Sequence, residues 1–261
     1  MMTQTHAAQA AHIERQFGIR AEAYVSSDVH AKGADLHRLI QVLEPYRGGV
    51  MLDLGCGGGH VSFTAAPLMQ HVVACDLSSR MLEAAAAEAA RRGLHQIETV
   101  SGTAEALPFA DHHFDVVVSR YSAHHWPDFE AGLRQAYRVL KPGGLAVFMD
   151  TAGFAEAAAD TVLQSIELLR DPSHVRNRTL AEWVQALGRA GFSIEDARSD
   201  SLVMDFAAWL ARMATPPVHE ASIRALLACL PHALRTRLGV QDEAISSWAV
   251  PIVFLIARRA A

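Results

Sequence analysis

The sequence contains little cysteine. Only three cysteines occur in 261 residues, namely Cys56, Cys75 and Cys229. No two of them have the spacing of a CxxC metal or redox pair, and an odd number does not suit a disulfide framework. We therefore expect a chain that keeps its thiols reduced, as cytoplasmic proteins do.

Clustered positive charge and long apolar stretches are also missing. Lys and Arg number 23 against 28 Asp and Glu, which gives a formal net charge of −5. Because non-specific binding to nucleic acid or to an anionic membrane needs clustered Lys and Arg, we expect neither partner. No run approaches the roughly 18 apolar residues of a spanning helix, and the polar N-terminus lacks the apolar region of a signal peptide. These absences predict a cytoplasmic protein without a membrane span.

The chain does contain a regular alternation of short apolar runs and longer helical segments. The runs predict five strands, over Val50–Leu54, Val72–Asp76, Ile97–Ser101, Phe114–Ser119 and Leu145–Asp150. The segments between them predict helices over His60–Gln70, Ser79–Arg92 and Phe129–Leu140, the last ended by a KPGG break. Such alternation is typical of an α/β protein whose parallel sheet is covered by helices on both faces.

Further elements are expected on either side of this alternation. A leader, residues 1–47, predicts two helices, one ending near Phe17 and one over Ala34–Leu43. After the alternation we expect a helix over Leu180–Ala190, a sixth strand near Ser193–Val203, a helical insertion over about Phe206–Ser247 and a last strand over Pro251–Ala257. The expected division is therefore a leader at 1–47, a core at 48–205, an insertion acting as a lid at 206–247 and the last core strand at 248–261.

A glycine-rich loop, Gly55-Cys56-Gly57-Gly58-Gly59, joins the first strand to a helix. Glycines at such a turn let a ligand approach the backbone, and the helix N-terminus supplies free N–H groups. A dinucleotide would require the GxGxxG pattern, but His60 occupies the place of its third glycine. Asp53, at the strand end, would repel a pyrophosphate and suits a cationic ligand such as the ammonium of a methionine group. The loop therefore disfavours a nicotinamide-dependent oxidoreductase.

A second acidic residue ends the second strand. Asp76 follows Gly55 by 21 residues, and a carboxylate there can accept hydrogen bonds from both hydroxyls of a ribose. Leu77 and Met81 come next and would pack against an adenine ring.

With these motifs the chain resembles the class I S-adenosylmethionine (SAM) dependent methyltransferases, in the branch that contains the ubiquinone and menaquinone C-methyltransferases. The matching segments are DLGCGGGH, CDLSSRML, GTAEALPF, FDVVVSRYSAHHW and RVLKPGG, in this order over residues 50–150. The resemblance implies a Rossmann-like sheet of seven strands, mostly parallel with the last strand antiparallel.

The resemblance also implies roles for individual residues in binding SAM. The backbone of Gly55, Cys56 and Gly57 would hold the methionine part, and Asp76 the ribose. Ala104 and Glu105 would lie at the edge of the adenine, Arg120 and Tyr121 near the sulfonium, and Tyr24 of the leader would close over the cofactor. Where the family often has Asp to accept the adenine amino group, this chain has Thr103, whose hydroxyl can also accept.

The segment after the fourth strand is the candidate for catalysis. It places Arg120, Tyr121, His124, His125 and Trp126 within seven positions. Either histidine could take a proton from the substrate while Trp126 forms a wall of the pocket. The alternative is that a histidine bonds to the backbone or caps the following helix and that Trp126 belongs to the core.

Three further residues are candidates for contact with substrate. Asp150, at the end of the fifth strand, could face the transferred methyl group or cap the next helix. In the insertion, Trp209 and Met213 share a helix face, and Arg212 could bind an acidic group or be a solvated surface residue. His174, Arg176 and Asn177 form another polar cluster in an expected loop. No HxH or HxxxH pair occurs in the core motifs, so we expect no metal.

The sequence therefore predicts a SAM-dependent methyltransferase with a small-molecule acceptor. An aromatic or quinone-like acceptor is suggested by family analogy alone. The alternative from another class is a catalytically inactive SAM-binding regulatory protein. The apolar last strand and the lid could form a homodimer surface, although no pattern demands one.

Overall fold

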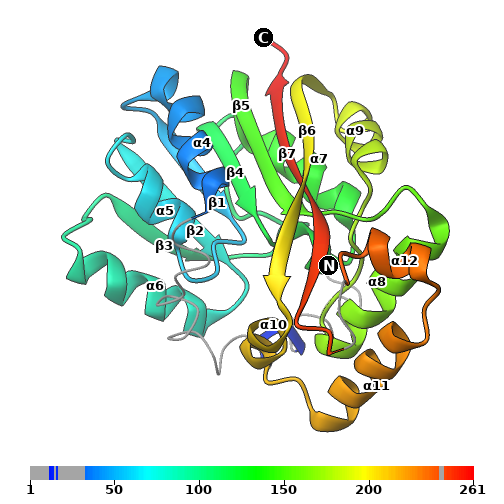
Figure 1. The fold of residues 1–261 in the computed structure, drawn as a ribbon. Coiled ribbons are helices and arrows are strands. Elements are labelled where there is room, and N and C mark those ends of the chain that lie inside the picture. Colours follow the sequence, from blue (N-terminus) through cyan, green and yellow to red (C-terminus); the bar gives the residue numbers. More distant parts are fainter. Residues whose placement is uncertain (1–11, 15, 17–32, 241–243) are drawn as a thin grey trace.

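Seven strands form a single sheet in the order β3-β2-β1-β4-β5-β7-β6 (Figure 1). The structure is a computed structural model, and it describes residues 12–14, 16, 33–240 and 244–261. The strands are β1 Val50–Leu54, β2 His71–Asp76, β3 Ile97–Ser101, β4 Phe114–Arg120, β5 Leu140–Thr151, β6 Phe192–Asp205 and β7 Ser247–Arg259. Strands β1 to β5 pair in parallel, while β7 runs antiparallel to both β5 and β6. The predicted mixed sheet with an antiparallel last strand is confirmed.

Helices cover both faces of this sheet. On one face lie α4 Ala34–Leu43, α5 His60–Ala65 and α6 Ser79–Arg91, and on the other α7 Phe129–Val139 and α9 Leu180–Arg189. The central strands are apolar in nearly every position because both their faces are buried. For example, two successive residues of β4, Val116 and Val117, belong to the clusters on opposite faces of the sheet.

Local sequence signals explain where the helices begin. The Ser78 hydroxyl accepts from the Met81 amide (3.3 Å) at the start of α6, and the Asp128 carboxylate accepts from the Ala131 amide (2.9 Å) at the start of α7. Thr179 and Glu182 form a reciprocal capping box at the start of α9. These caps satisfy N–H groups that the helices cannot satisfy internally.

A third cluster of apolar residues lies beyond the carboxyl ends of the parallel strands, towards the bottom of Figure 1. It joins α8 Ala157–Arg170 to the helices of the insertion, α10 Phe206–Met213, α11 Pro217–Ala228 and α12 His232–Arg237. Trp209 is 1% exposed and contacts Trp248 with ring centroids 4.7 Å apart. Met213 is also 1% exposed, so the predicted common face of Trp209 and Met213 is buried.

The sequence analysis missed or misplaced parts of this architecture. We predicted no helix at 157–170, where α8 begins at Ala157 and its N-cap residue, Glu156, forms no side-chain cap. The helix before KPGG ends at Val139, within one residue of the prediction, but β5 begins already at Leu140 and not at Leu145. Lys141–Gly144 bulge out of the β4 ladder between the pairs Phe114–Leu140 and Val116–Leu145. The helix predicted over His60–Gln70 ends earlier, at Ala65, two residues before Pro67.

Two predictions concern the ends of the chain. Tyr24 lies outside the described residues, as does most of the leader ahead of α4. Among the residues that the structure describes, no helix is long and apolar enough to cross a membrane.

The buried ring of Trp209 provides a test of the third cluster. We expect Trp209→Ala to lower the free energy of unfolding by about 3–5 kcal/mol, because it removes a large side chain from a filled core. The matched control is Val218→Ala in α11, where the side chain is 68% exposed and the cost should stay within about 0.5 kcal/mol. Urea denaturation measures both, and equal midpoints for the two variants would contradict this packing.

Candidate active site

The candidate site lies where the chain order of the sheet reverses. Strands β1 and β4 are neighbours in the middle of the sheet, and the chain leaves them towards opposite edges. In an open α/β sheet, ligands bind outside the carboxyl ends of the strands at such a point. The loops that follow β1, β2 and β4 carry most of the residues that we predicted for the cofactor and for catalysis.

The glycine loop after β1 is held against both neighbouring strands. The amides of Gly55 and Cys56 donate to the Cys75 carbonyl of β2 at 2.8 and 3.0 Å. Gly55 has φ +72°, and a Cβ atom there would lie 1.9 Å from the Ser122 hydroxyl. At Gly57, with φ +48°, a Cβ would meet nothing within 4 Å. The loop is therefore packed at Gly55 and open at Gly57, which suits a ligand lying on the Gly57 side.

Asp76 links the end of β2 to this loop. Its carboxylate accepts from the Gly57 amide at 2.8 Å and from the Ser78 amide at 2.9 Å. Burial raises the pKa of Asp76, while these backbone bonds work in the opposite direction. A carboxylate has acceptor capacity beyond two hydrogen bonds, so Asp76 can still accept from a ribose.

The other predicted acid, Asp53, is turned towards α5. It is 1% exposed, and one of its oxygens accepts from the Ser62 amide (3.0 Å) and hydroxyl (2.7 Å). Burial outweighs these bonds and raises the pKa of Asp53 to about 7. The observed role of Asp53 is to fix the first turn of α5, and contact with a methionine ammonium stays a prediction.

The residues predicted to surround adenine lie on the β2 side of the loop. Met81 and Ala104 are buried, and Leu77 and Glu105 are half-buried. The Thr103 hydroxyl oxygen is buried and has no hydrogen-bond partner in the part of the chain that the structure describes. Since a buried polar atom is costly to leave unpaired, Thr103 fits a position that a ligand completes.

Arg120 and Tyr121 end β4. Arg120 forms an ion pair with Asp35 of α4, at 2.5 and 3.1 Å, and its guanidinium lies 4.8 Å from the centre of the Tyr121 ring. Tyr121 has φ +50°, which turns the chain sharply out of the strand. Burial raises the pKa of Tyr121 to about 12, so its hydroxyl stays protonated at neutral pH.

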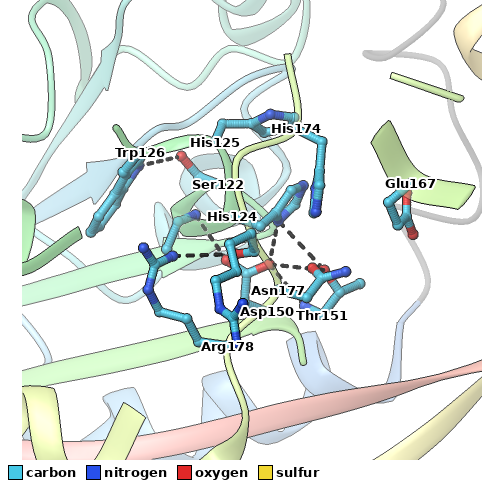
Figure 2. Close-up of polar contacts among 12 residues, drawn as sticks. Ser122, His124, His125, Trp126, Asp150, Thr151, Glu167, His174, Asn177 and Arg178 are labelled. Carbon is cyan, nitrogen blue, oxygen red and sulfur yellow. Dashed lines mark hydrogen bonds and ion pairs between the residues drawn. The ribbon is translucent and has the colours of Figure 1, made fainter. Parts of the chain in front are cut away.

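His124 and Asp150 form the central pair of the site (Figure 2). His124 follows β4 and Asp150 lies near the end of the adjacent β5, where Nδ1 of His124 is 2.6 Å from a carboxylate oxygen of Asp150. The side chains are 16% and 2% exposed. Burial by itself would lower the pKa of His124, but the charge and hydrogen bond of Asp150 outweigh it and raise that pKa above its ordinary value. Asp150 also accepts from the Ala123 amide at 2.8 Å, so it holds the loop as well as the ring.

Two more imidazoles lie against His124. The ring centroids of His125 and His174 are 4.1 and 5.8 Å from that of His124. His125 Nδ1 faces the Ser173 carbonyl at 3.2 Å, and His174 Nε2 faces the Gln164 side-chain oxygen at 3.0 Å. Burial and the charge of His124 lower their pKa values, to about 4 for His125 and about 2 for His174. Both rings are therefore neutral at pH 7.

The segment after α8 contributes residues that sequence reasoning did not connect to this site. We predicted His174, Arg176 and Asn177 only as a polar cluster in a loop. Asn177 is fully buried, and its oxygen accepts from the Thr151 hydroxyl (2.7 Å), next to Asp150. The amides of Val175 and Arg176 donate to the His124 carbonyl. No local pattern links positions about 50 residues apart, so only the fold could reveal these contacts.

Other predicted residues lie away from an open pocket. Trp126 is 5% exposed and packs in the core beside Gly132, with its Nε1 donating to the Ser122 hydroxyl at 3.1 Å. Trp209 belongs to the buried cluster around α8 and α10, and Arg212 beside it is half-buried. The alternative that Asp150 caps the following helix is wrong, since α8 begins seven residues later at Ala157. Within the described ranges, no group of three His, Cys, Asp or Glu side chains could hold a metal ion.

Comparison with known proteins places this site in a family. A family model described as a methyltransferase domain matches residues 52–148. YafE of Escherichia coli K12 is 42% identical over 189 residues, which cover 72% of this chain and 91% of YafE. The uncharacterized methyltransferase YcgJ of Bacillus subtilis 168 is 33% identical over 210 residues, or 80% of this chain and 83% of YcgJ. The crystal structure of YcgJ matches with a TM-score of 0.83 over 87% of this chain and 98% of that one.

A more distant relative has a named biosynthetic role. UbiE of Bradyrhizobium diazoefficiens, a ubiquinone/menaquinone biosynthesis C-methyltransferase, is 38% identical over 126 residues, which cover 46% of this chain and 49% of UbiE. The chain therefore belongs to the class I SAM-dependent methyltransferases, with SAM as its cofactor. The predicted family, enzyme class and cofactor are confirmed.

Gly55 and Gly57 of the loop have different steric surroundings, which mutation can distinguish. Gly57→Ala should cost about 1 kcal/mol of folding free energy, because only the left-handed backbone is strained. Gly55→Ala adds the clash with Ser122 to the same strain, so we expect a clearly larger loss in urea denaturation. Equal losses for the two variants would show that the loop does not press against the end of β4.

Proposed function

We propose that this enzyme methylates a small molecule whose nucleophile must first lose a proton, and that His124 takes this proton. The single observation that carries the proposal is the 2.6 Å contact between His124 and the buried Asp150, at the carboxyl ends of β4 and β5. A histidine with one nitrogen held by a carboxylate presents its other nitrogen as the base.

The cofactor would be held by residues of the glycine loop and of the two loops beside it. Gly57 leaves open space, Asp76 has spare acceptor capacity, and the buried Thr103 oxygen has no described partner. These three features fit the methionine, ribose and adenine parts of SAM respectively. When bound there, SAM supplies a methyl group on a positively charged sulfur, which is open to nucleophilic attack.

Asp150 would fix both the direction and the basicity of His124. With Nδ1–H donating to Asp150, the lone pair of His124 is on Nε2, which can accept the proton of the substrate. The imidazolium that forms is stabilised by the adjacent carboxylate, which is already desolvated and in place. Thr151 and Asn177 hold the other side of this arrangement, since Thr151 donates to Asn177 and follows Asp150 directly.

The neighbouring imidazoles would keep the charge on His124. His125 and His174 are neutral at pH 7, with pKa values of about 4 and 2. Their ring nitrogens face a backbone carbonyl and a side-chain amide oxygen. We therefore assign them positioning roles, and His124 the proton transfer.

A nucleophile of this kind is found in a phenol, an enol or a ring carbon activated by a neighbouring hydroxyl. The name of the relative UbiE suggests the last of these, a quinone-like ring methylated on carbon. The composition, with its net charge of −5, does not favour nucleic acid as the acceptor. We also propose that the chain forms a homodimer whose surface includes the apolar last strand.

The role of His124 predicts a mutational and a pH effect. We expect His124→Ala to lower kcat by a factor between about 100 and 10,000, as loss of a general base does, with unchanged affinity for S-adenosylhomocysteine. Because the pKa of His124 is raised, the base form appears only above the ordinary histidine pKa, and kcat should rise with pH through a value above 6.5. In Asp150→Asn this step should move to lower pH and the maximal rate should fall, as the carboxylate that holds the proton is gone.

The control for this experiment is His95→Ala, at an exposed histidine outside the site. An acceptor screen on the unmodified chain precedes the kinetics. Turnover of an acceptor that is unchanged in His124→Ala would refute the role of the base. Tight binding of S-adenosylhomocysteine with no turnover of any acceptor would favour the inactive regulatory protein.

The role of Asp76 predicts a loss of cofactor binding. Asp76→Ala should weaken S-adenosylhomocysteine by about 100-fold in calorimetric titration, because it removes charge-assisted acceptors for the ribose hydroxyls. Asp76→Asn keeps one carbonyl oxygen and should lie between this variant and the wild type. Wild-type affinity in both variants would show that the ribose does not bind at Asp76.

A further inference from the structure

A cavity lies between the first turns of α7 and α9. Its volume is about 680 Å³, a size that suits a small organic ligand. Phe129 and Glu130 of α7, Glu182 and Ala186 of α9, and Arg178 from the preceding segment are among its lining residues. None of these residues was placed in the proposed active site above.

Arg178 differs from the other arginines around this cavity. Arg189 and Arg134 face Glu130 at 2.7 and 3.8 Å, and their side chains are more than half exposed. Arg178 is half-buried, and among the described residues no carboxylate lies within ion-pair distance of it. Burial, together with the nearby Arg176, lowers the pKa of Arg178. A guanidinium withdrawn from water in this way gains most from an anionic partner.

The guanidinium of Arg178 is also held in a fixed position. It lies 4.0 Å from the centre of the Phe129 ring, and that ring is in turn fixed edge-on against Trp183 with centroids 4.6 Å apart. One of its terminal nitrogens donates to the Arg176 carbonyl at 3.2 Å. A guanidinium has five N–H donors, so donors remain for a ligand, and stacking pre-orients them as a fork.

The acids of the cavity are already engaged. Asp128 caps α7, and Glu130 pairs with Arg189 and Arg134. Glu182 accepts from the Thr179 amide at 2.8 Å and pairs with Arg176 at 3.2 Å. In addition, residues of the first turns of α7 and α9, where helix dipoles are positive, line this cavity. The arrangement leaves Arg178 as a cation for a bound anion.

We infer that this cavity binds a carboxylate or phosphate group through the Arg178 guanidinium. The site also adjoins the proposed catalytic pair. Arg178 accepts from the Gly153 amide through its carbonyl (3.1 Å) and forms a bridge to Ala152, so its segment is fastened to the chain just after Asp150 (Figure 2). The anion can therefore belong to the methyl acceptor or to a separate ligand that binds beside it.

The test is calorimetric titration of the full chain with phenyl phosphate and benzoate, with neutral benzamide as the control ligand. We expect the two anions to bind and benzamide not to bind. Arg178→Gln should weaken both anions by about tenfold or more, as expected for a lost charged hydrogen bond. Arg134→Gln, at an arginine of the same cavity that is already paired, is the matched control and should bind as the wild type does. Equal binding by Arg178→Gln, or equal weakening by Arg134→Gln, would overturn the site.

A second measurement covers the case in which Arg178→Gln does not fold. The guanidinium N–H signal of Arg178 is assigned in the NMR spectrum of the wild type as the signal that the Arg178→Lys spectrum lacks. We expect this signal to shift when phenyl phosphate is added and to stay unchanged when benzamide is added. An unshifted signal would overturn the inference. None of these measurements needs turnover, so they stand apart from the test of His124.

Turnover distinguishes the two sources of the anion. If the anion belongs to the acceptor, Arg178→Gln should raise KM for acidic acceptors and leave their methyl esters unaffected. If it belongs to a separate ligand, phenyl phosphate binding should depend on Arg178 while the turnover of every acceptor is independent of it. Both results support the anion site; the first assigns the anion to the acceptor, and the second assigns it to a separate ligand.

Discussion

The contact between the glycine loop and the end of β4 is the constraint on which the active site depends. Gly55 lies so close to Ser122 that no side chain fits between them, and the Ser122 hydroxyl accepts from Trp126 in the core. The cofactor loop and the catalytic loop are thus fastened at one point. Tyr121, with its left-handed backbone, turns the chain there, so that His124 reaches the end of β5. Placement of a base relative to a cofactor is a matter of tenths of an ångström, and a packed backbone contact provides it better than a mobile surface loop.

The charges around His124 follow from the same geometry. Three imidazoles lie close together in a largely buried site, and only one of them can carry a proton without severe repulsion. Asp150 determines which one, because its carboxylate lies 2.6 Å from His124, whereas Asp171, the acid beside His125, stays 3.9 Å from that ring. His125 and His174 then have lowered pKa values, since they are buried and face the charged His124. The short contact with one buried carboxylate therefore distinguishes His124 from two chemically identical side chains, because environment sets the pKa of each group.

The sequence predicts what is encoded locally and fails where distant segments meet. The strands, the glycine loop and Asp76 follow from short patterns, and so the sheet and the cofactor were predicted correctly. His124 and Asp150 were both named as candidates, but their pairing across β4 and β5 could not be derived from positions 26 residues apart. Trp126 was expected at a pocket wall or in the core, and Gly132, one turn into α7, leaves the room that buries it. Arg178 was missed because nothing in the residues around it distinguishes a stacked, half-buried arginine from a solvated one.

The fold narrows the choice of methyl acceptor less than the residues after β5 do. Class I methyltransferases share the loops that follow β1 and β2, and these loops serve the cofactor. We expect the acceptor instead to lie at the ends of β4 and β5 and against the segment that contacts them. In this chain that segment is 171–179, which lies with His174 against His124 and Asn177 against Thr151 and presents Arg178 to a cavity. A ligand with an ionisable nucleophile and an acidic group would use both sides of this one segment. The segment is therefore where acceptor specificity is expected to lie, and relatives that differ in it should differ in what they methylate even when their glycine loops are the same.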